Sequence, residues 1–225
     1  MRVVVLTGAG ISAESGVPTF RDADGLWAGH RVEDVATPEA YVARPEVVHE
    51  FYDARRRALA GVEPNAAHRA LARLEERLGD GLLVVTQNVD DLHESAGSTR
   101  VLHMHGELRS AWCTLCDVRH PWDDTLAHRP PCPACGRPSL RPDVVWFGEL
   151  PHGMDRIESA LADADLFVSI GTSGEVYPAA GFVQVAKAFG GEPWSSTSYR
   201  AVAPTGSTRP ATLRPGPSSP PGSTP

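Results

Sequence analysis

The chain has no long apolar run and no excess of positive charge, and each absence argues against one class of function. No stretch approaches the roughly 20 consecutive apolar residues that a membrane-spanning helix needs, and no secretory signal comes before the apolar run that starts at Val3. The formal net charge of −7 over 225 residues gives no basic field that would attract nucleic acid. We therefore expect a cytoplasmic protein that binds neither membranes nor a specific nucleic acid. We also expect it to be a monomer.

The N-terminal stretch is the first that indicates a ligand. The apolar run 3–6 predicts a buried strand, which leads directly into Gly8-x-Gly10-x-x-Ala13, the spacing of a dinucleotide-binding turn. Residues 14–22 are too rich in glycine and proline to continue as one long helix. By itself the glycine pattern fits an ordinary turn equally well, so other motifs must decide.

The rest of the chain alternates between apolar strands and helical segments, and 41% hydrophobic residues suffice for one core. Helices are expected at 46–60, 65–78 and 178–189, and strands at 82–86, 143–147 and the second half of 161–171, with a short strand and turn at 100–106. This pattern predicts an α/β fold, a Rossmann-like parallel sheet with a small helical insertion and a zinc-ribbon insertion. The expected parts are the sheet from residues 1–29, 81–110 and 142–190, the helical insertion 30–80 and the zinc-binding module 111–141.

The only four cysteines form two pairs, Cys113-x-x-Cys116 and Cys132-x-x-Cys135, separated by fifteen residues. Two such pairs can close a tetrahedral site for a structural zinc ion. Two disulfides are the competing interpretation, which is poor for a chain without a secretory signal. Because four protein ligands leave no open coordination position, the metal would hold a loop and take no part in chemistry. A nucleic-acid-binding zinc ribbon is the other functional interpretation, and the acidic composition argues against it.

Several motifs, in this order along the chain, resemble those of the sirtuin family over roughly residues 1–190. They are Gly8-Ala9-Gly10-Ile11-Ser12, Gly16-Val17-Pro18-Thr19-Phe20-Arg21, Thr86-Gln87-Asn88-Val89-Asp90-Asp91-Leu92-His93, His105-Gly106-Glu107-Leu108 and Gly171-Thr172-Ser173. The resemblance implies NAD-dependent removal of acyl groups from the lysine side chains of proteins, with NAD consumed as a co-substrate. The products would be nicotinamide, the lysine and an O-acyl-ADP-ribose.

The resemblance also implies roles for individual residues. His105 matches the family's catalytic base, a role that suits histidine because it titrates near pH 7, and a polar histidine at a strand end is the alternative. The residues that match NAD-binding positions are Gly8, Ala9, Gly10, Ile11, Ser12, Phe20, Arg21, Gln87, Asn88, Asp90, Gly171, Thr172 and Ser173. Without the resemblance, the residues at 87–90 could cap the next helix, and those at 171–173 could form an ordinary turn.

Two further stretches are expected to contact the acylated substrate. The residues that match the family's peptide-clamping segment, which pairs with the substrate by strand addition, are Val144, Val145, Phe147 and Gly148. Tyr52 and Arg55 lie three residues apart on a predicted helix and are similar to the pair that binds the distal carboxylate in desuccinylase-type sirtuins. Arginine offers a carboxylate a planar fork, and tyrosine adds a hydroxyl donor. The alternative is a solvated arginine run at 55–57 beside a core tyrosine.

The end of the chain departs from the family. Residues 191–225 are mostly Ser, Thr, Pro, Gly and Arg without apolar periodicity, which predicts a low-complexity, disordered tail. Sirtuins instead have a strand here, with an asparagine that reaches the adenosine ribose, and then a last helix; we expect neither. Codons compatible with residues 192–198, read two bases later, can encode such a strand with its asparagine. A frameshift near Gly190 would explain the departure, and a genuinely evolved tail is the other explanation.

One leading function and two alternatives follow. The leading function is an NAD-dependent protein deacylase that removes succinyl, malonyl or glutaryl groups and also acetyl groups. Loss of the C-terminal strand and helix would instead leave a catalytically impaired protein that only binds NAD or ADP-ribose. An ADP-ribosyltransferase is the third interpretation, which the intact His105 motif and the pair Tyr52 and Arg55 disfavour.

Overall fold

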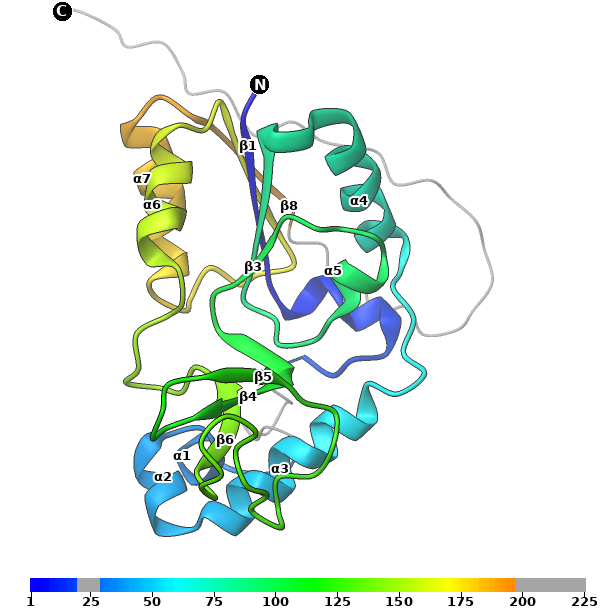
Figure 1. Ribbon diagram of the computed structural model, residues 1–225. Coiled ribbons are helices and arrows are strands. Elements are labelled where there is room, and N and C mark those ends of the chain that lie inside the picture. The colour runs from blue at the N-terminus through cyan, green and yellow to red at the C-terminus, as the bar shows by residue number, and fades with distance from the viewer. Residues whose placement is uncertain (20–28, 197–225) are drawn as a thin grey trace, which may run out of the picture.

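The computed structural model describes residues 1–19 and 29–196, which form a larger and a smaller lobe (Figure 1). The larger lobe is built on a parallel five-stranded sheet in the order β3-β2-β1-β7-β8. Its strands are β1 (Val3–Thr7), β2 (Leu82–Thr86), β3 (Val101–His103), β7 (Leu166–Ile170) and β8 (Glu192–Ser196). The predicted α/β fold with a Rossmann-like parallel sheet is therefore confirmed.

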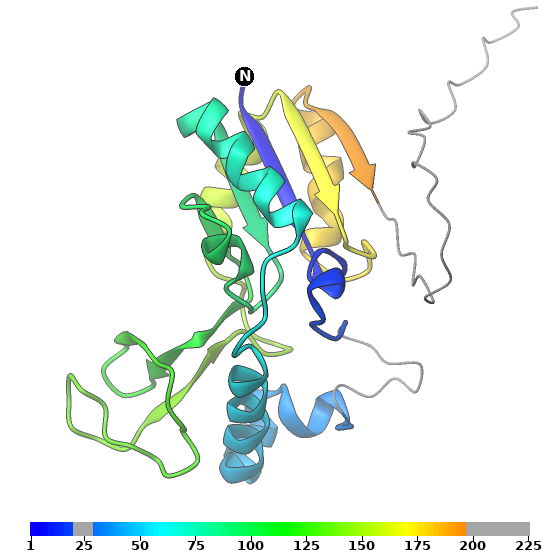
Figure 2. The same cartoon turned by 90° about the vertical axis from the view of Figure 1, so that its right-hand side faces the viewer.

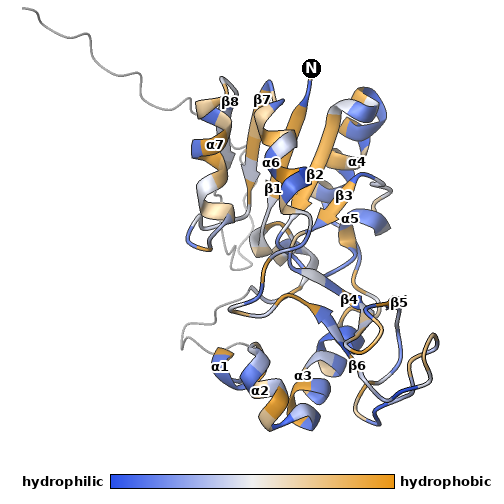
Figure 3. Cartoon of the chain, turned by 60° about the vertical axis from the view of Figure 1, so that its left-hand side comes forward, coloured by the Kyte–Doolittle hydropathy of each residue, from blue (hydrophilic) through white to orange (hydrophobic). Residues whose placement is uncertain are grey.

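Helices cover both faces of this sheet (Figure 1). Those of the larger lobe are α4 (Ala66–Leu78) and α5 (Leu92–Ser95) on one side, and α6 (Met154–Ala162) and α7 (Phe182–Ala188) on the other. Side chains of β1 alternate between two apolar cores, because Val3 and Val5 pack with Leu71 of α4, whereas Val4 and Leu6 pack against α6 and α7. Burial on both faces explains the continuous apolar runs of the central strands, which Figure 3 shows in orange.

Local signals in the sequence explain where several helices begin. In α4 the Asn65 side chain accepts a hydrogen bond from the Ala67 N–H (2.9 Å), as expected of an N-cap. The turn after β1 consists of two short 3-10 segments that end at Ser15, and no long helix follows in the described residues up to 19, as the glycine and proline content of residues 14–22 predicted. The 3-10 segments are η1 (Ala9–Ile11), η2 (Ala13–Ser15), η3 (Gly79–Gly81) and η4 (Ala179–Gly181). None of the helices in the described parts of the chain has the length and apolar character to cross a membrane.

The smaller lobe combines a three-stranded antiparallel sheet, in the order β5-β4-β6, with three helices (Figures 1 and 2). The elements are α1 (Val32–Val35), α2 (Pro38–Ala43), α3 (Pro45–Ala58), β4 (Gly106–Cys113), β5 (Arg119–Pro121) and β6 (Leu140–Val144). Its core packs Leu108, Val144 and Trp146 against Val48 and Tyr52 of α3. The four cysteines lie at the end of β4 and in the loops that join the strands of this sheet.

One predicted strand has different boundaries in the structure. A strand was expected at 143–147, but β6 begins at Leu140 and ends at Val144. The reason is that the next residues leave the sheet for other partners, since the Val145 N–H donates to the His105 carbonyl oxygen (2.9 Å) and the Phe147 N–H to that of Ala36 (3.0 Å). The segment therefore turns from the antiparallel sheet toward the space between the lobes.

The expectation that no strand follows Gly190 is wrong. Strand β8 pairs in parallel with β7, beside it in Figure 2. Main-chain pairing holds β8 without an apolar pattern, since Trp194 remains 47% exposed. Pro193 is compatible with this strand because β8 forms an edge of the described sheet, where a missing N–H is tolerated. Residues 197–225 lie outside the described residues, and the frameshift near Gly190 stays a hypothesis.

Candidate active site

A cavity of about 710 Å³ opens where the carboxyl ends of the parallel strands meet the smaller lobe. Gly8 follows β1, Gln87 follows β2 and Gly171 follows β7, and all three residues line the cavity. Tyr52 of α3 and Leu108 of β4 line it from the smaller lobe. Ligands of open α/β sheets bind at such strand ends, so the cavity lies where the sequence predicted a nucleotide.

The structure brings most of the predicted site residues to this cavity. Those from the predicted NAD-binding set that line it are Gly8, Ala9, Ser12, Gln87, Asn88, Asp90, Gly171, Thr172 and Ser173. His105 and the predicted substrate residues Tyr52, Arg55, Val144, Val145, Phe147 and Gly148 line it as well. Gly10 and Ile11 lie in the turn beneath it, where the Gly10 N–H donates to the Gly171 carbonyl oxygen (2.8 Å) and Ile11 is buried. Phe20 and Arg21 lie outside the described residues.

The floor of the cavity can be built only from glycine. A Cβ added at Gly171, whose φ is +63°, would lie 2.3 Å from the Ile11 nitrogen. A Cβ added at Gly8 would lie 2.9 Å from the Gly171 carbonyl oxygen. The two loops therefore pack backbone against backbone, which suits the close approach of a pyrophosphate to main-chain N–H groups. The residues present thus fit NAD at this edge of the sheet.

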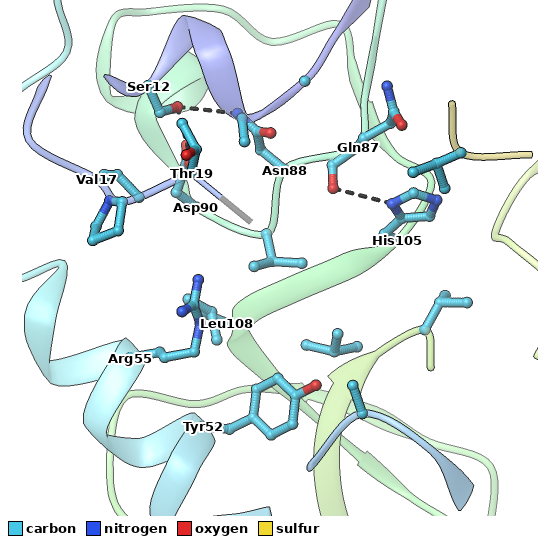
Figure 4. A pocket seen from close by; sticks show the side chains of 18 of the residues that line it. Ser12, Val17, Thr19, Tyr52, Arg55, Gln87, Asn88, Asp90, His105 and Leu108 are labelled. Carbon is cyan, nitrogen blue, oxygen red and sulfur yellow. Dashed lines mark hydrogen bonds between the residues drawn. The ribbon is translucent and has the colours of Figure 1, made fainter. Parts of the chain in front are cut away.

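Beside this floor, polar side chains hold one another in fixed orientations. The Gln87 side chain donates to the Thr172 hydroxyl (3.0 Å), and the Asn88 side chain donates to the Ser12 hydroxyl (3.0 Å; Figure 4). Ser12 in turn donates to the Asp90 carboxylate (2.9 Å). Burial raises the pKa of Asp90 above its usual value, and the hydrogen bond from Ser12 opposes this shift. Amide and carboxylate groups are therefore presented to a ligand in a preset arrangement.

Two histidines near the end of β3 have different surroundings. The Nδ1 of His105 lies 3.2 Å from the Gln87 carbonyl oxygen (Figure 4), so that nitrogen carries the proton and Nε2 carries the lone pair. Burial lowers the pKa of His105 more than the Gln87 hydrogen bond raises it, which favours the neutral imidazole. In contrast, His103 uses both nitrogens inside the protein, at 3.0 Å from the Asn88 carbonyl oxygen and 2.9 Å from Glu94 Oε1. Of these two histidines, His105 is the one that lines the cavity and has a lowered pKa.

Helix α3 directs two polar side chains into the cavity from the smaller lobe (Figure 4). Tyr52 is fully buried, and its hydroxyl accepts a hydrogen bond from the Trp146 indole N–H (3.0 Å). Burial raises the pKa of Tyr52, so its hydroxyl stays protonated. Burial also lowers the pKa of Arg55, while Tyr52 and Asp90 act in the opposite direction. A protonated hydroxyl and a guanidinium therefore reach the same cavity as His105.

The three arginines at 55–57 do not form a solvated run. Arg55 lines the cavity, Arg56 is 4% exposed and pairs with Asp53, and Arg57 is exposed. Helical geometry causes this division, because successive residues are turned by about 100° around the helix axis. The alternative in which all three side chains are solvated is therefore excluded by their surroundings.

The predicted peptide-clamping segment already uses much of its main chain within the protein. The N–H groups of Val145 and Phe147 donate to other loops, and the Trp146 N–H donates to Glu149 Oε2 (2.8 Å). An extended peptide that pairs with these residues would therefore have to use their carbonyl oxygens. Strand addition at this segment stays a prediction.

The cysteine cluster has the geometry of a closed metal site. One sulfur from each cysteine lies within 4.8 Å of all the others, with Cys113 to Cys135 at 3.7 Å and Cys116 to Cys132 at 3.8 Å. A tetrahedral zinc site with Zn–S bonds of about 2.3 Å places sulfurs about 3.8 Å apart. The thiols are not joined as disulfides. The predicted four-cysteine site is confirmed, and its donor set fits structural zinc.

Sequence reasoning missed residues that orient the predicted ones. Trp146, which donates a hydrogen bond to Tyr52, lies inside the predicted peptide-clamping segment. Its large side chain was the only sign in the sequence that it packs against another predicted residue. Asp53 and Arg56 each follow one residue of the predicted acyl-binding pair by one position. Their spacing of three residues was visible, but it is also typical of an exposed helical ion pair.

Known proteins similar to this chain agree with the site. A model described as the Sir2 family matches residues 8–178. The NAD-dependent protein deacylase of Escherichia coli (strain K12) is 59% identical over 192 residues, covering 84% of this chain and 69% of that protein. The protein of that description from Yersinia pestis is 62% identical over 184 residues, covering 80% of this chain and 66% of its own. A solved Sir2 homologue–NAD complex is 44% identical, with a TM-score of 0.77 over 86% of this chain and 77% of that chain. The chain therefore belongs to the Sir2 (sirtuin) family of NAD-dependent protein deacylases, as its motifs indicated.

Proposed function

We propose that this sirtuin removes succinyl, malonyl and glutaryl groups from protein lysines with NAD as co-substrate, and that it removes acetyl groups as well. The observation that carries this proposal is that Tyr52 and Arg55 line the same cavity as His105. A dicarboxylic acyl chain on a lysine held near His105 can extend toward α3. An acetyl group fits the same cavity and ends before it reaches that helix.

The larger lobe would carry out the chemistry. NAD, when bound, would supply the ribose carbon that the acyl oxygen attacks as nicotinamide leaves; with one water consumed, the products are nicotinamide, lysine and an O-acyl-ADP-ribose. In this proposal His105 accepts a proton from a ribose hydroxyl at Nε2, because the Gln87 carbonyl oxygen holds the proton on Nδ1. Asn88 and Asp90, fixed by Ser12, hold the nicotinamide end of the cofactor.

The smaller lobe would choose the acyl group. The Arg55 guanidinium offers a carboxylate two parallel hydrogen bonds, and the protonated Tyr52 hydroxyl offers a third donor. Trp146 fixes the Tyr52 oxygen by donating to it, so this donor is preset before the substrate arrives. The four-cysteine site holds the loops of this lobe and takes no part in the reaction. In this proposal the protein is a monomer and acts in the cytoplasm.

Substitution of Arg55 by methionine tests the acyl preference. Arg55→Met keeps an unbranched, flexible stem, although a shorter one, and removes the charge and the hydrogen-bond donors of the guanidinium. Its kcat/KM for a succinyl-lysine peptide should fall by about 10- to 100-fold, the value of a lost charged hydrogen bond. Its kcat/KM for the matched acetyl-lysine peptide should stay within about threefold. Mass spectrometry measures the turnover of each peptide by the parent chain and by Arg55→Met, with NAD and, as a blank, without it.

The neighbouring Arg57→Met is the matched control, since Arg57 is exposed and should leave both activities unchanged. Equal loss of both activities in Arg55→Met would contradict the acyl assignment. No turnover of either peptide by the parent chain, together with measurable NAD binding, would instead support the impaired binding protein.

A further inference from the structure

Helix α3 carries two polar pairs, and only one of them faces the cavity. Tyr52 and Arg55 line the cavity, whereas Asp53 and Arg56 form an ion pair in which Arg56 Nη1 lies 2.7 Å from Asp53 Oδ1. The side chains of this second pair are at most 3% exposed. Each of its members follows a cavity residue by one position, so the two pairs share the same turn of the helix and face different neighbours.

Asp53 connects α3 to the segment 124–127, which lies next to the cysteine cluster. Its carboxylate accepts hydrogen bonds from the Leu126 N–H (2.9 Å), the Ala127 N–H (3.1 Å) and the Thr125 hydroxyl (2.6 Å). The Leu126 side chain is fully buried in an apolar core that also contains two of the cysteines. A single carboxylate thus connects the helix to the four-cysteine module.

Arg56 connects the same turn of α3 to strand β4. Its Nε donates to the Leu108 carbonyl oxygen (2.6 Å), and its Nη1 also donates to the Asp124 carbonyl oxygen (3.1 Å). The Leu108 N–H donates in turn to the Val89 carbonyl oxygen (2.8 Å), in the loop that carries Asn88 and Asp90. The ion pair therefore spans the module, the helix and the strand that borders the cavity.

We propose that Asp53 and Arg56 are positioning residues for the acyl subsite, and that through them the four-cysteine module sets the preference for acidic acyl groups. The inference rests on the function proposed above for Tyr52 and Arg55. Without the link, α3 can shift against β4, and about 1 Å at the guanidinium is enough to lose a bidentate contact. An acetyl group makes no such contact, and the residues around His105 are held by the parallel strands.

The test compares Asp53→Asn with Asp34→Asn. Asp34 pairs with Arg44 at 2.7 Å, the same length as the buried pair and in the same lobe, but both of its side chains are exposed. The succinyl-to-acetyl ratio of kcat/KM should fall about tenfold in Asp53→Asn, mainly through KM for the succinyl peptide. Acetyl turnover should stay within about threefold. Asp53→Asn should also release zinc to a chromogenic chelator several-fold faster, and Asp34→Asn should match the parent chain in every measurement.

Arg56→Lys decides the matter if Asp53→Asn does not fold. Lysine keeps one charged contact but cannot bridge the Leu108 and Asp124 carbonyl oxygens as the guanidinium does, so the ratio should fall here too. A parallel loss of both activities, or faster zinc release with an unchanged ratio, would overturn the positioning role. If Arg55→Met lowers the succinyl-to-acetyl ratio of kcat/KM, but Asp53→Asn and Arg56→Lys leave this ratio unchanged, only the positioning role fails. If Arg55→Met itself leaves the ratio unchanged, both the proposed function and the positioning role fail.

Discussion

The edge of the parallel sheet and helix α3 form opposite walls of one cavity, yet they hold their side chains by different means. At the sheet edge, the polar residues lie in the short loops that follow the strands, and main-chain hydrogen bonds such as Gln87 N–H to the Thr7 carbonyl oxygen (2.9 Å) fix these loops. On α3, Arg55 depends on the position of a whole helix. In the proposal above, that position is set by the Asp53–Arg56 ion pair, whose hydrogen-bond partners lie up to 74 residues away in the sequence.

Under the proposed function, this difference separates the chemistry of the reaction from the choice of acyl group. The sheet edge belongs to the most regular part of the fold, so the groups around His105 are preset by strand pairing. The proposed acyl-binding wall belongs to the lobe that holds the four-cysteine site, so its geometry can change while the parallel sheet stays intact. Substitutions at the sheet edge should therefore affect all substrates alike, and changes in the smaller lobe should affect them unequally.

The largest effect is expected at the sheet edge, from His105→Ala. Loss of the proposed base should lower kcat by about 10²- to 10⁴-fold, because a positioned acid–base group contributes about that much. The loss should be equal for succinyl and acetyl peptides. NAD binding, measured by calorimetry, should persist because the glycine floor and the residues from 87 to 90 are unchanged.

His103→Gln is the control for this experiment. It removes a histidine two residues away whose nitrogens bond within the protein, and it should keep most of the turnover. Residual activity of His105→Ala above a tenth of the parent rate would contradict the assignment. An unequal loss for the two peptides would contradict the expectation that the sheet edge acts on all substrates alike.

Removal of the metal should have an intermediate effect, confined to the other wall. A strong chelator should loosen the four-cysteine module, because ligand binding and folding are coupled at such sites. Hydrogen exchange read by mass spectrometry should then rise across 111–141 and in α3, while β1 and β2 keep their protection. Deacylation should fall, more steeply for the succinyl peptide. Equal loss of protection in β1 would show that the lobes unfold as one unit.

The sequence was sufficient for the sheet edge because local rules act there. An apolar strand followed directly by Gly8, Gln87 or Gly171 places each residue at the same edge, once the strands are parallel. The cysteine spacing worked for a similar reason, since two short pairs leave few ways to close a metal site.

Tertiary contacts explain what the sequence could not give. Asp53 and Thr125 are 72 residues apart, and nothing local to either shows that the two side chains meet. An acid and a base three residues apart on a helix usually face solvent, so the pattern of Asp53 and Arg56 pointed away from burial. Strand β8 was missed because main-chain pairing with β7 outweighed a composition typical of disorder.

The smallest effect is expected from pH, which should leave the succinyl-to-acetyl ratio of kcat/KM unchanged. The pKa of His105 is lowered by burial, so the neutral base persists below the usual histidine range. As pH falls, kcat/KM for both peptides should stay level through about 6.5, the ordinary histidine pKa, and decline only at lower pH, with the same midpoint.

The ratio of kcat/KM for the two peptides should stay constant from pH 6 to 9, because arginine remains charged and burial raises the pKa of Tyr52. A distal carboxyl group with a pKa of about 4.3 also stays ionised over this range. A ratio that changes between pH 6 and 9 would mean that a titrating group other than Tyr52 and Arg55 contacts the acyl chain, and the division of labour between the two walls would no longer hold.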